Sequence, residues 1–241
     1  MAGSKAGSKG GKGPGGTGSG RAVAVRVKTA RRRSASSTRW LQRQLNDPYV
    51  QEARRRGYRS RAVFKIEELD AKHRLLHRGM RVIDLGAAPG GWTQYAAEKV
   101  GPSGRVVALD LLEMDPVPGA TVLMGDLTDP AVEAQLRDAL GGPADLVLSD
   151  MAPTMMGHAP TDHLRSVGLA EAAVDLAAGV LVPGGSFVAK VLQGSDEPAL
   201  TAALRKRFAK VSRIKPAASR DESREFYLVA TGFRGDAEGQ G

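Results

Sequence analysis

From about residue 60 onward, short apolar runs rich in β-branched residues alternate with longer segments of helical periodicity. The short runs predict strands and the longer segments predict helices. The strand candidates are residues 81–86, 105–111, 121–126, 144–150, 185–192 and 225–233. The helix candidates are residues 61–74, 92–100, 130–140, 163–181 and 197–208. Strands that are nearly continuous in apolar residues and separated by helices predict a parallel sheet covered on both faces.

Two details refine this pattern. The longest helix candidate has one apolar stripe at three- and four-residue steps, formed by Leu164, Val167, Ala170, Val174, Ala177 and Leu181. The last strand candidate is separated from the preceding helix only by residues 209–224, which is too short for another helical crossover. We therefore expect the chain to turn back through residues 210–217 and to pair its last strand antiparallel. The predicted fold is α/β, with a mostly parallel sheet and an antiparallel last strand.

The first 43 residues differ in composition from the rest. Residues 1 to about 20 consist almost entirely of Gly, Ser, Ala and Lys, a composition that cannot bury enough apolar surface to offset the entropy of folding. Residues 21–43 are basic and contain no acid. We expect a disordered basic arm over residues 1–43, one folded domain over residues 44–233 and a flexible tail over residues 234–241.

The formal net charge of +9 is concentrated in this arm. Eleven of the 35 Lys and Arg residues precede the first acid, Asp47, which leaves 24 basic against 26 acidic residues in the remainder. Such an arm is typical either of a solvated segment or of a nucleic-acid contact. A basic, Ser-containing stretch is also compatible with a mitochondrial transit peptide, so we expect a cytoplasmic protein with a mitochondrial location as the alternative.

Composition excludes several classes of protein. The chain has no cysteine, which rules out disulfides, thiolate zinc sites and a cysteine nucleophile. The histidines, His73, His77, His158 and His163, lack a metal-ligand spacing, so we expect no metal, and we read the last two as part of a polar loop. No apolar run approaches the roughly 20 residues that span a bilayer, so we expect no membrane contact.

Acidic residues end four of the predicted strands: Asp84, Asp110, Asp126 and Asp150. In open α/β sheets, ligands bind beyond the carboxyl ends of the strands. A single acid there is as well explained by a helix cap or a turn. Four acids at equivalent places indicate a ligand site.

The segment VIDLGAAPGGW, residues 82–92, ends the first strand candidate in a glycine-rich bend. Glycines let the backbone approach a ligand closely. The segment lacks the G-x-G-x-x-G pattern and contains a proline, which disfavours a pyrophosphate cradle and a hydride-transferring dehydrogenase. Asp110 is placed to accept hydrogen bonds from ribose hydroxyls and Asp126 from an adenine amino group. These features predict a nucleoside-bearing cofactor without phosphates, and S-adenosylmethionine fits.

Several longer segments, in order, resemble the FtsJ/RrmJ-type ribose 2′-O-methyltransferases of ribosomal RNA. They are RSRAVFKIEELDAK, VIDLGAAPGGW, LDLLEMDPVPG, the pair Gly125-Asp126, LSDMAP, FVAKVLQG and SREFYLVATG, and together they span about Arg59 to Gly232. The resemblance implies a Rossmann-like fold with a seven-stranded sheet that binds S-adenosylmethionine. It implies methylation of a uridine ribose in large-subunit (23S) ribosomal RNA on the assembled 50S particle, by a monomer.

The resemblance also implies site residues. The cofactor-binding residues would be Gly90, Trp92, Asp110, Asp126 and Asp150. The catalytic residues would be Lys65, Asp150, Lys190 and Glu225. From the residues alone, Lys65 also fits a solvated helix face with Arg61 and Glu68, Glu225 a strand-edge charge, and Trp92 the core.

The chemistry of the reaction explains why these residue types are needed. A ribose hydroxyl is a poor nucleophile, so it has to be positioned and deprotonated. A lysine acts as a base only when uncharged, and a second cation nearby disfavours its charged form. We therefore expect Lys190 to be the base and Lys65 the second cation, with Asp150 and Glu225 orienting the two ammonium groups.

The segment RRRGYRSRAVFK, residues 54–65, combines dense positive charge with Tyr58 and Phe64. It predicts an RNA-binding groove with rings available for base stacking. The cluster at residues 205–216 is equally compatible with a charged helix end. Two other functions stay open: 2′-O-methylation of another RNA, such as transfer RNA, and a non-catalytic RNA-binding role in ribosome assembly. A base methyltransferase is disfavoured, because residues 149–153 read SDMAP without its Pro-Pro pair.

Overall fold

The sheet determines where the functional side chains lie. The computed structural model describes residues 42, 44–153, 156–194 and 196–235, and the fold described below belongs to the unit that begins at Asp47. The predicted arm and tail lie almost entirely outside the described residues, so the predicted domain boundaries, 44 and 233, stay a prediction.

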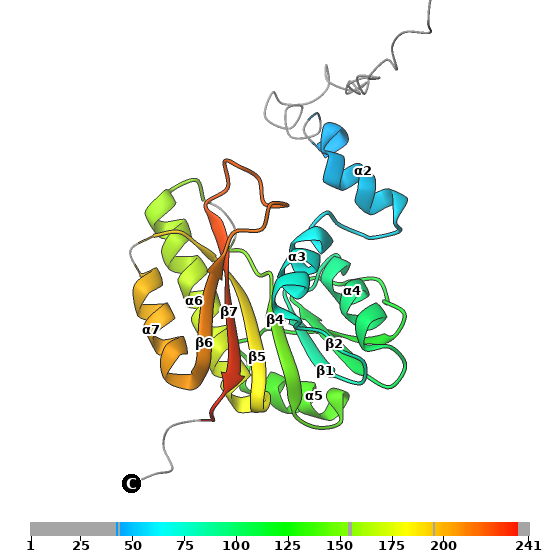
Figure 1. Ribbon diagram of the computed structural model, residues 1–241, viewed down its shortest axis with the longest axis vertical. Coiled ribbons are helices and arrows are strands. Elements are labelled where there is room, and N and C mark those ends of the chain that lie inside the picture. The colour runs from blue at the N-terminus through cyan, green and yellow to red at the C-terminus, as the bar shows by residue number, and fades with distance from the viewer. Residues whose placement is uncertain (1–41, 43, 154–155, 195, 236–241) are drawn as a thin grey trace, which may run out of the picture. The chain divides into compact units, whose positions relative to one another are not determined.

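The strands form one seven-stranded sheet in the order β3-β2-β1-β4-β5-β7-β6 (Figure 1). The pairs β1–β2, β2–β3, β1–β4 and β4–β5 are parallel, whereas β7 is antiparallel to both β5 and β6. This confirms the predicted α/β fold. The strands are β1 (Arg81–Leu85), β2 (Arg105–Asp110), β3 (Ala120–Met124), β4 (Ala144–Ser149), β5 (Leu181–Leu192), β6 (Phe208–Ile214) and β7 (Glu225–Phe233).

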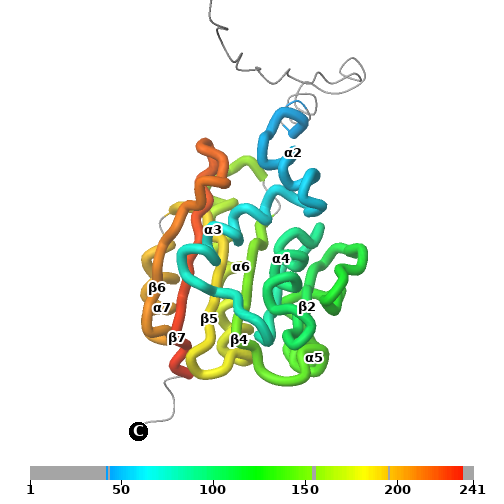
Figure 2. The backbone as a smooth tube through the Cα atoms, turned by 45° about the vertical axis from the view of Figure 1, so that its right-hand side comes forward, coloured from blue at the N-terminus to red at the C-terminus, as the bar shows by residue number. Residues whose placement is uncertain are grey.

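The end of the chain returns as predicted. Residues 210–217 were expected only to turn the chain back, but residues 208–214 form a strand, β6, which pairs along β7. Figure 2 shows the two strands side by side in orange and red. Phe208 begins β6 where α7 ends, and its buried ring packs against the rings of Phe187 and Phe233. These ring contacts join the end of the last helix to the sheet.

The helices cover both faces of the sheet (Figure 1). In the unit that begins at Asp47, the five predicted helices are confirmed, and one short helix was not predicted. The helices are α2 (Pro48–Arg55), α3 (Val63–His73), α4 (Gly91–Val100), α5 (Pro130–Leu140), α6 (Ala159–Val180) and α7 (Glu197–Arg207). The unpredicted helix, α2, is capped by the Asp47 side chain, which accepts a hydrogen bond from Tyr49 N at 3.0 Å.

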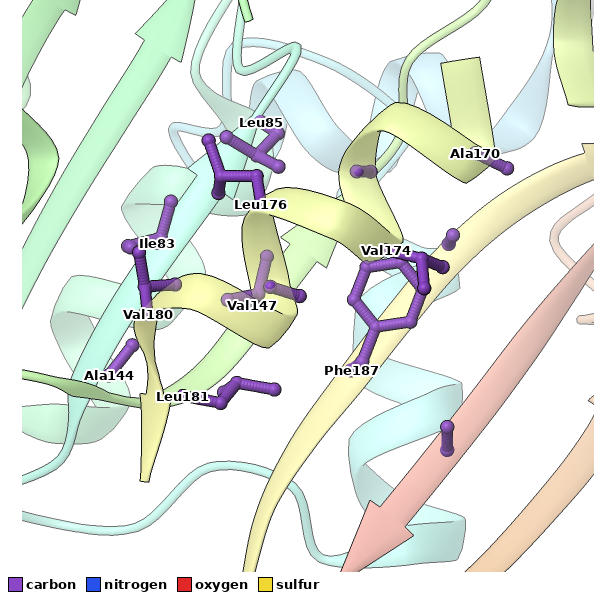
Figure 3. Close-up of a cluster of buried hydrophobic side chains, with 14 of the residues drawn as sticks. Ile83, Leu85, Ala144, Val147, Ala170, Val174, Leu176, Val180, Leu181 and Phe187 are labelled. Carbon is purple, nitrogen blue, oxygen red and sulfur yellow. The ribbon is translucent and has the colours of Figure 1, made fainter. Parts of the chain in front are cut away.

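Two apolar clusters hold the helices to the sheet. One joins α5, α6 and α7 to one face, and the other joins α3 and α4 to the opposite face. Figure 3 shows part of the first cluster, where Val174 of α6 lies beside Phe187, and Val180 of α6 beside Ile83 and Val147. Helices therefore cover both faces of the sheet, and a ligand site is expected at the edge formed by the carboxyl ends of the parallel strands.

The structure corrects the predicted stripe of α6 at one position. Leu164 is 59% exposed, whereas the other helical positions of the stripe are buried. The helix also begins at Ala159 rather than at residue 163, so His163 lies in a helix and not in a loop.

Replacing Phe187 with alanine tests the packing of the first cluster. Phe187 is fully buried, so the variant loses about 3–5 kcal/mol of unfolding free energy through lost burial and a residual cavity. Urea unfolding followed by circular dichroism measures this loss. The matched control is Leu164→Ala, which changes stability by less than about 0.5 kcal/mol because Leu164 is exposed. Equal effects of the two changes would contradict the assignment of the core.

Candidate active site

A cavity of about 330 Å³ lies beyond the carboxyl ends of β1, β2 and β4. Three of the four predicted acids, Asp110, Asp126 and Asp150, line it together with apolar side chains that include Leu85, Leu109, Met151 and Leu169. Its size falls in the range of small-molecule sites, and a few polar groups among apolar walls are typical of such sites. The cavity is therefore the best candidate for a nucleoside-bearing ligand in the described part of the chain.

The two carboxylates that were expected to bind a nucleoside are held in place by backbone groups. Asp110 accepts hydrogen bonds from Ala88 N on one oxygen and from Leu112 N on the other, both at 2.8 Å. Asp126 accepts from the backbone N of Thr128 at 2.9 Å and from its hydroxyl at 2.8 Å, and the backbone hydrogen bond is the largest cause that lowers the pKa of Asp126. Each carboxylate oxygen has further acceptor capacity. Both acids are thus fixed acceptors at the cavity.

Packing requires glycine at two positions of the bend that follows β1, Gly86 and Gly90. Gly86 has φ of +70°, and a Cβ there would lie 2.4 Å from Cγ of Met151. Gly90 has φ of +108°, and a Cβ there would lie 2.9 Å from a guanidinium nitrogen of Arg59. A side chain at either position would strain the backbone and displace a neighbour. The bend therefore depends on glycine at both places.

Two predicted cofactor-binding residues do not line the cavity. Trp92 is 3% exposed, donates from Nε1 to the carbonyl of Ala62 at 2.7 Å and packs on the ring of Tyr227. Gly90 packs toward Arg59 and the loop after β2. The structure thus does not bring them together with Asp110 and Asp126, and their role as cofactor contacts stays a prediction. For Trp92, this burial matches the alternative interpretation of a core residue.

Asp84 lies within β1, beneath the bend, and is fully buried. Its Oδ2 accepts a hydrogen bond from the Thr93 hydroxyl at 2.7 Å, while no hydrogen bond to its Oδ1 is found among the described residues. Burial, with smaller contributions from Asp150 and Asp110, raises the pKa of Asp84 to about 7. This acid therefore supports the bend from below and does not line the cavity.

The four predicted catalytic residues converge at the ends of β4, β5 and β7. Lys190 Nζ lies 3.0 Å from Oδ1 of Asp150 and donates to the carbonyl of Asp150 at 2.6 Å. Lys65 Nζ of α3 lies 2.6 Å from Oε1 of Glu225. All four side chains are largely buried. Two buried ion pairs therefore stand together, and one of their members, Asp150, also lines the cavity.

The two pairs form one electrostatic cluster. Burial raises the pKa of Asp150, but the positive charges of Lys190 and Lys65, together with hydrogen bonds from Tyr227 and Lys190, outweigh this effect, so the pKa lies below its ordinary value. Burial likewise raises the pKa of Glu225, and the same two lysines reverse the shift. Each acid thus interacts with both lysines, which requires all four groups to lie close together.

Tyr227 is a further member of the cluster that the sequence analysis missed. Its hydroxyl donates to Oδ1 of Asp150 at 2.6 Å, and Lys65 Nζ lies 5.6 Å from the centre of its ring. Burial and the charge of Asp150 raise the pKa of Tyr227, so the hydroxyl stays a donor. The strand period gave a usable signal, because Tyr227 lies two residues after Glu225 and so faces the same side.

The prediction that Tyr58 and Phe64 stack on RNA bases is wrong. They are only 7% and 8% exposed, and the guanidinium of Arg56 lies over both rings. Arg56 is itself paired with Glu67. The rings belong to the core on the α3 side of the sheet.

The nearby arginines are also used within the fold. Arg59 donates to the carbonyls of Pro89, Asp115 and Pro116. Arg61 pairs with Asp47 and donates to the carbonyl of Ala218. Much of the positive charge of this segment is therefore neutralised or bound internally.

No group of three or more His, Cys, Asp or Glu side chains is arranged to hold a metal ion within the described ranges. No helix in this part of the chain has the length and hydropathy to cross a membrane.

Known proteins resemble this chain in sequence and in fold. A model of the FtsJ-like methyltransferase family matches residues 58–233. A protein of Paramagnetospirillum magneticum named ribosomal RNA large subunit methyltransferase E is 57% identical over 231 residues, which cover 94% of this chain and 95% of the relative. A protein of the same name from Xanthobacter autotrophicus is 56% identical over 91% of this chain and 87% of its own.

A solved structure is also similar. The crystal structure of a Plasmodium falciparum protein described as a ribosomal RNA methyltransferase superposes with a TM-score of 0.66 at 29% identity. The match covers 74% of this chain and all of that one. The whole of that solved chain therefore shares the fold described above.

Changing Asp84 to asparagine tests the environment beneath the bend. Because the pKa of Asp84 rises from 3.8 to about 7 on folding, the folded chain keeps a proton that the unfolded chain releases. Protonated Asp84 therefore contributes to the free energy of unfolding at low pH. This contribution falls by up to about 1.4 kcal/mol per pH unit as the pH rises from about 4 to about 7.

Urea unfolding of wild type and Asp84→Asn between pH 5 and 8 measures this effect, because other titrating groups cancel in the difference between them. The stability of wild type relative to the variant should fall as pH rises and level off above about pH 7. A difference that is flat across this range would show that Asp84 keeps its ordinary pKa.

Proposed function

The chain belongs to the FtsJ-like methyltransferase family, and from this premise we propose that it methylates a ribose 2′-hydroxyl, that of a uridine, in large-subunit (23S) ribosomal RNA. The methyl donor is S-adenosylmethionine, and the reaction takes place in the cytoplasm on the assembled 50S particle. The observation that carries the proposal is Asp150, which lines the candidate donor cavity and also belongs to the buried lysine cluster.

The residues of the cavity fit this donor. Asp110 and Asp126 offer fixed carboxylate oxygens for ribose hydroxyls and an amino group, and the apolar walls suit an adenine ring. The donor supplies an electrophilic methyl group when bound. A donor of this kind needs no phosphate-binding loop, in agreement with a bend that lacks the dinucleotide pattern.

The cluster supplies the chemistry at the acceptor. In the proposed step, Lys190 first gives up the proton that makes it an ammonium beside Asp150, and its free amine then takes the proton of the 2′-hydroxyl. The ribose oxygen bonds to the methyl carbon as the bond between that carbon and the donor's sulfur breaks. Asp150 fixes the direction of Lys190, and Glu225 fixes Lys65 on the other side. We assign Lys65 as the second cation of the cluster. A single chain provides all four groups, so we propose a monomer as the active form.

The charge balance of the cluster suits the reaction. The donor loses its positive charge on transfer, so an excess of negative charge at the site would stabilise the ground state more than the transition state. Two lysines beside two acids avoid this penalty. The complete set of ionisable side chains also favours catalysis over a purely RNA-binding role.

Incubation with labelled S-adenosylmethionine tests the substrate. Separate pools of large subunits, small subunits, free ribosomal RNA and transfer RNA are offered, and the labelled nucleoside is identified after complete nuclease digestion. We expect label in the large subunit as 2′-O-methyluridine. Label in transfer RNA would move the proposal to the alternative substrate, and label on a base would overturn the assigned acceptor atom.

Changing Lys190 to alanine tests the proposed base. We expect kcat to fall by at least about 10²–10⁴-fold, because proton removal is lost. The dissociation constant for S-adenosylmethionine, measured by calorimetry, should change little, because Lys190 is not among the residues lining the donor cavity. The matched control is Lys99→Ala on α4, whose lysine pairs loosely with Asp70 at 3.9 Å and should keep full activity. Wild-type turnover by the Lys190 variant would exclude the residue as the base.

A further inference from the structure

A second cavity lies one step further along the carboxyl edge of the sheet. It has a volume of about 330 Å³ and is formed by three segments: residues 157–163 at the start of α6, residues 192–193 at the end of β5, and residues 222–224 before β7. The proposed reaction makes no use of it. Its residues belong in part to the motifs FVAKVLQG and SREFYLVATG, whose glutamine has no role in the chemistry described above.

This cavity begins where the catalytic cluster ends. Leu192 in its wall is the register partner of Glu225 on the neighbouring strand. Leu192 also lies two residues beyond Lys190, which is about 7 Å along a strand. A ligand that places one group at Lys190 can therefore place the next group in this cavity.

The walls of the cavity are preformed. Asp162 is 2% exposed and accepts hydrogen bonds from Met156 N and Gly157 N. The ring nitrogens of His163 lie 3.0 Å from the carbonyl of Leu192 and 3.1 Å from a carboxylate oxygen of Asp196. Because these buried groups find their partners inside the protein, the walls need no ligand to form.

Gln193 is held at the mouth by its backbone. Its N–H donates to the carbonyl of Arg224 at 2.9 Å, and its carbonyl accepts from the guanidinium of Arg224 at 2.7 Å. The next residue, Gly194, is pressed against His163, since a Cβ there would lie 2.4 Å from the ring. The side chain of Gln193 is exposed, and among the described residues we find no hydrogen bond from its amide. A donor and an acceptor thus stand together at the opening.

We propose that this cavity receives the base of a nucleotide next to the methylated ribose, and that the amide of Gln193 hydrogen-bonds to the edge of that base. The inference rests on the proposed function, because it needs an RNA whose ribose lies at Lys190. A neutral base fits the cavity better than a phosphate, because Asp162 and Glu222 oppose the single positive charge of Arg224. Proteins that read RNA sequence typically bind unstacked bases of single strands in this way.

Two variants test the proposal, one by removing the hydrogen-bonding amide and one by filling the cavity. Gln193→Ala removes the amide while the backbone bonds to Arg224 remain. Ala159→Trp fills the cavity from the exposed first turn of α6. The matched controls are Gln135→Ala and Ala134→Trp, two exposed positions on α5 that do not line this cavity. Melting temperatures and donor dissociation constants show that each variant is folded and binds S-adenosylmethionine.

The measurement is kcat/KM for methylation of large ribosomal subunits that lack the modification. Both cavity variants should lose about tenfold, while the controls match wild type. Subunits altered at the nucleotides on either side of the methylated one provide the second readout. Wild type should discriminate among them by about tenfold, and Gln193→Ala should lose this discrimination.

The outcomes separate the two proposals. If wild type methylates the subunits and both cavity variants keep its kcat/KM and its discrimination, the neighbouring-base site is excluded and the proposed function stands. If wild type binds S-adenosylmethionine but methylates no ribosomal RNA, the proposed function fails and the base site fails with it.

Discussion

The burial of Asp150 between Lys190 and Tyr227 is the interaction on which the site depends. A carboxylate removed from water costs several kcal/mol unless charges and hydrogen bonds compensate it. Here one oxygen receives both the ammonium of Lys190 and the hydroxyl of Tyr227, and Lys65 adds a second positive charge. Removing a partner would leave the charge of Asp150 less compensated, so the groups of the cluster depend on one another.

The direction of β7 makes this cluster possible. In a parallel strand only the last residues reach the carboxyl edge of the sheet. Because β7 runs antiparallel to β5, its first residues reach that edge, and Glu225 and Tyr227 arrive beside Leu192 and Lys190. The antiparallel strand therefore adds an acid and a hydroxyl donor to an edge where β4 and β5 already place Asp150 and Lys190.

Much of this arrangement could be predicted from the sequence. Apolar runs and helical stripes give the buried elements, because burial leaves a periodic pattern. The helix α2 was missed because it is short and mostly polar: PYVQEARR has one buried residue, Ala53, and forms beside a capping Asp47. The strand β6 was hidden for the same reason, because its side chains alternate only weakly between buried and exposed. Elements at the margin of the fold depend on neighbours that the local sequence does not show.

The role of a charged residue is harder to predict from the sequence than the position of a buried helix or strand. The arginines of residues 54–61 suggest an RNA surface, yet Arg59 and Arg61 bind backbone carbonyls and Arg56 covers two aromatic rings. Arg59 shows what this internal use achieves: it joins the bend at Pro89 to the loop at Asp115 and Pro116, beside the donor cavity. A guanidinium has five donors in a fixed plane, which suits it to link several carbonyls at once. Part of the basic character of the folded domain thus builds the site, and only the remainder is available to attract RNA.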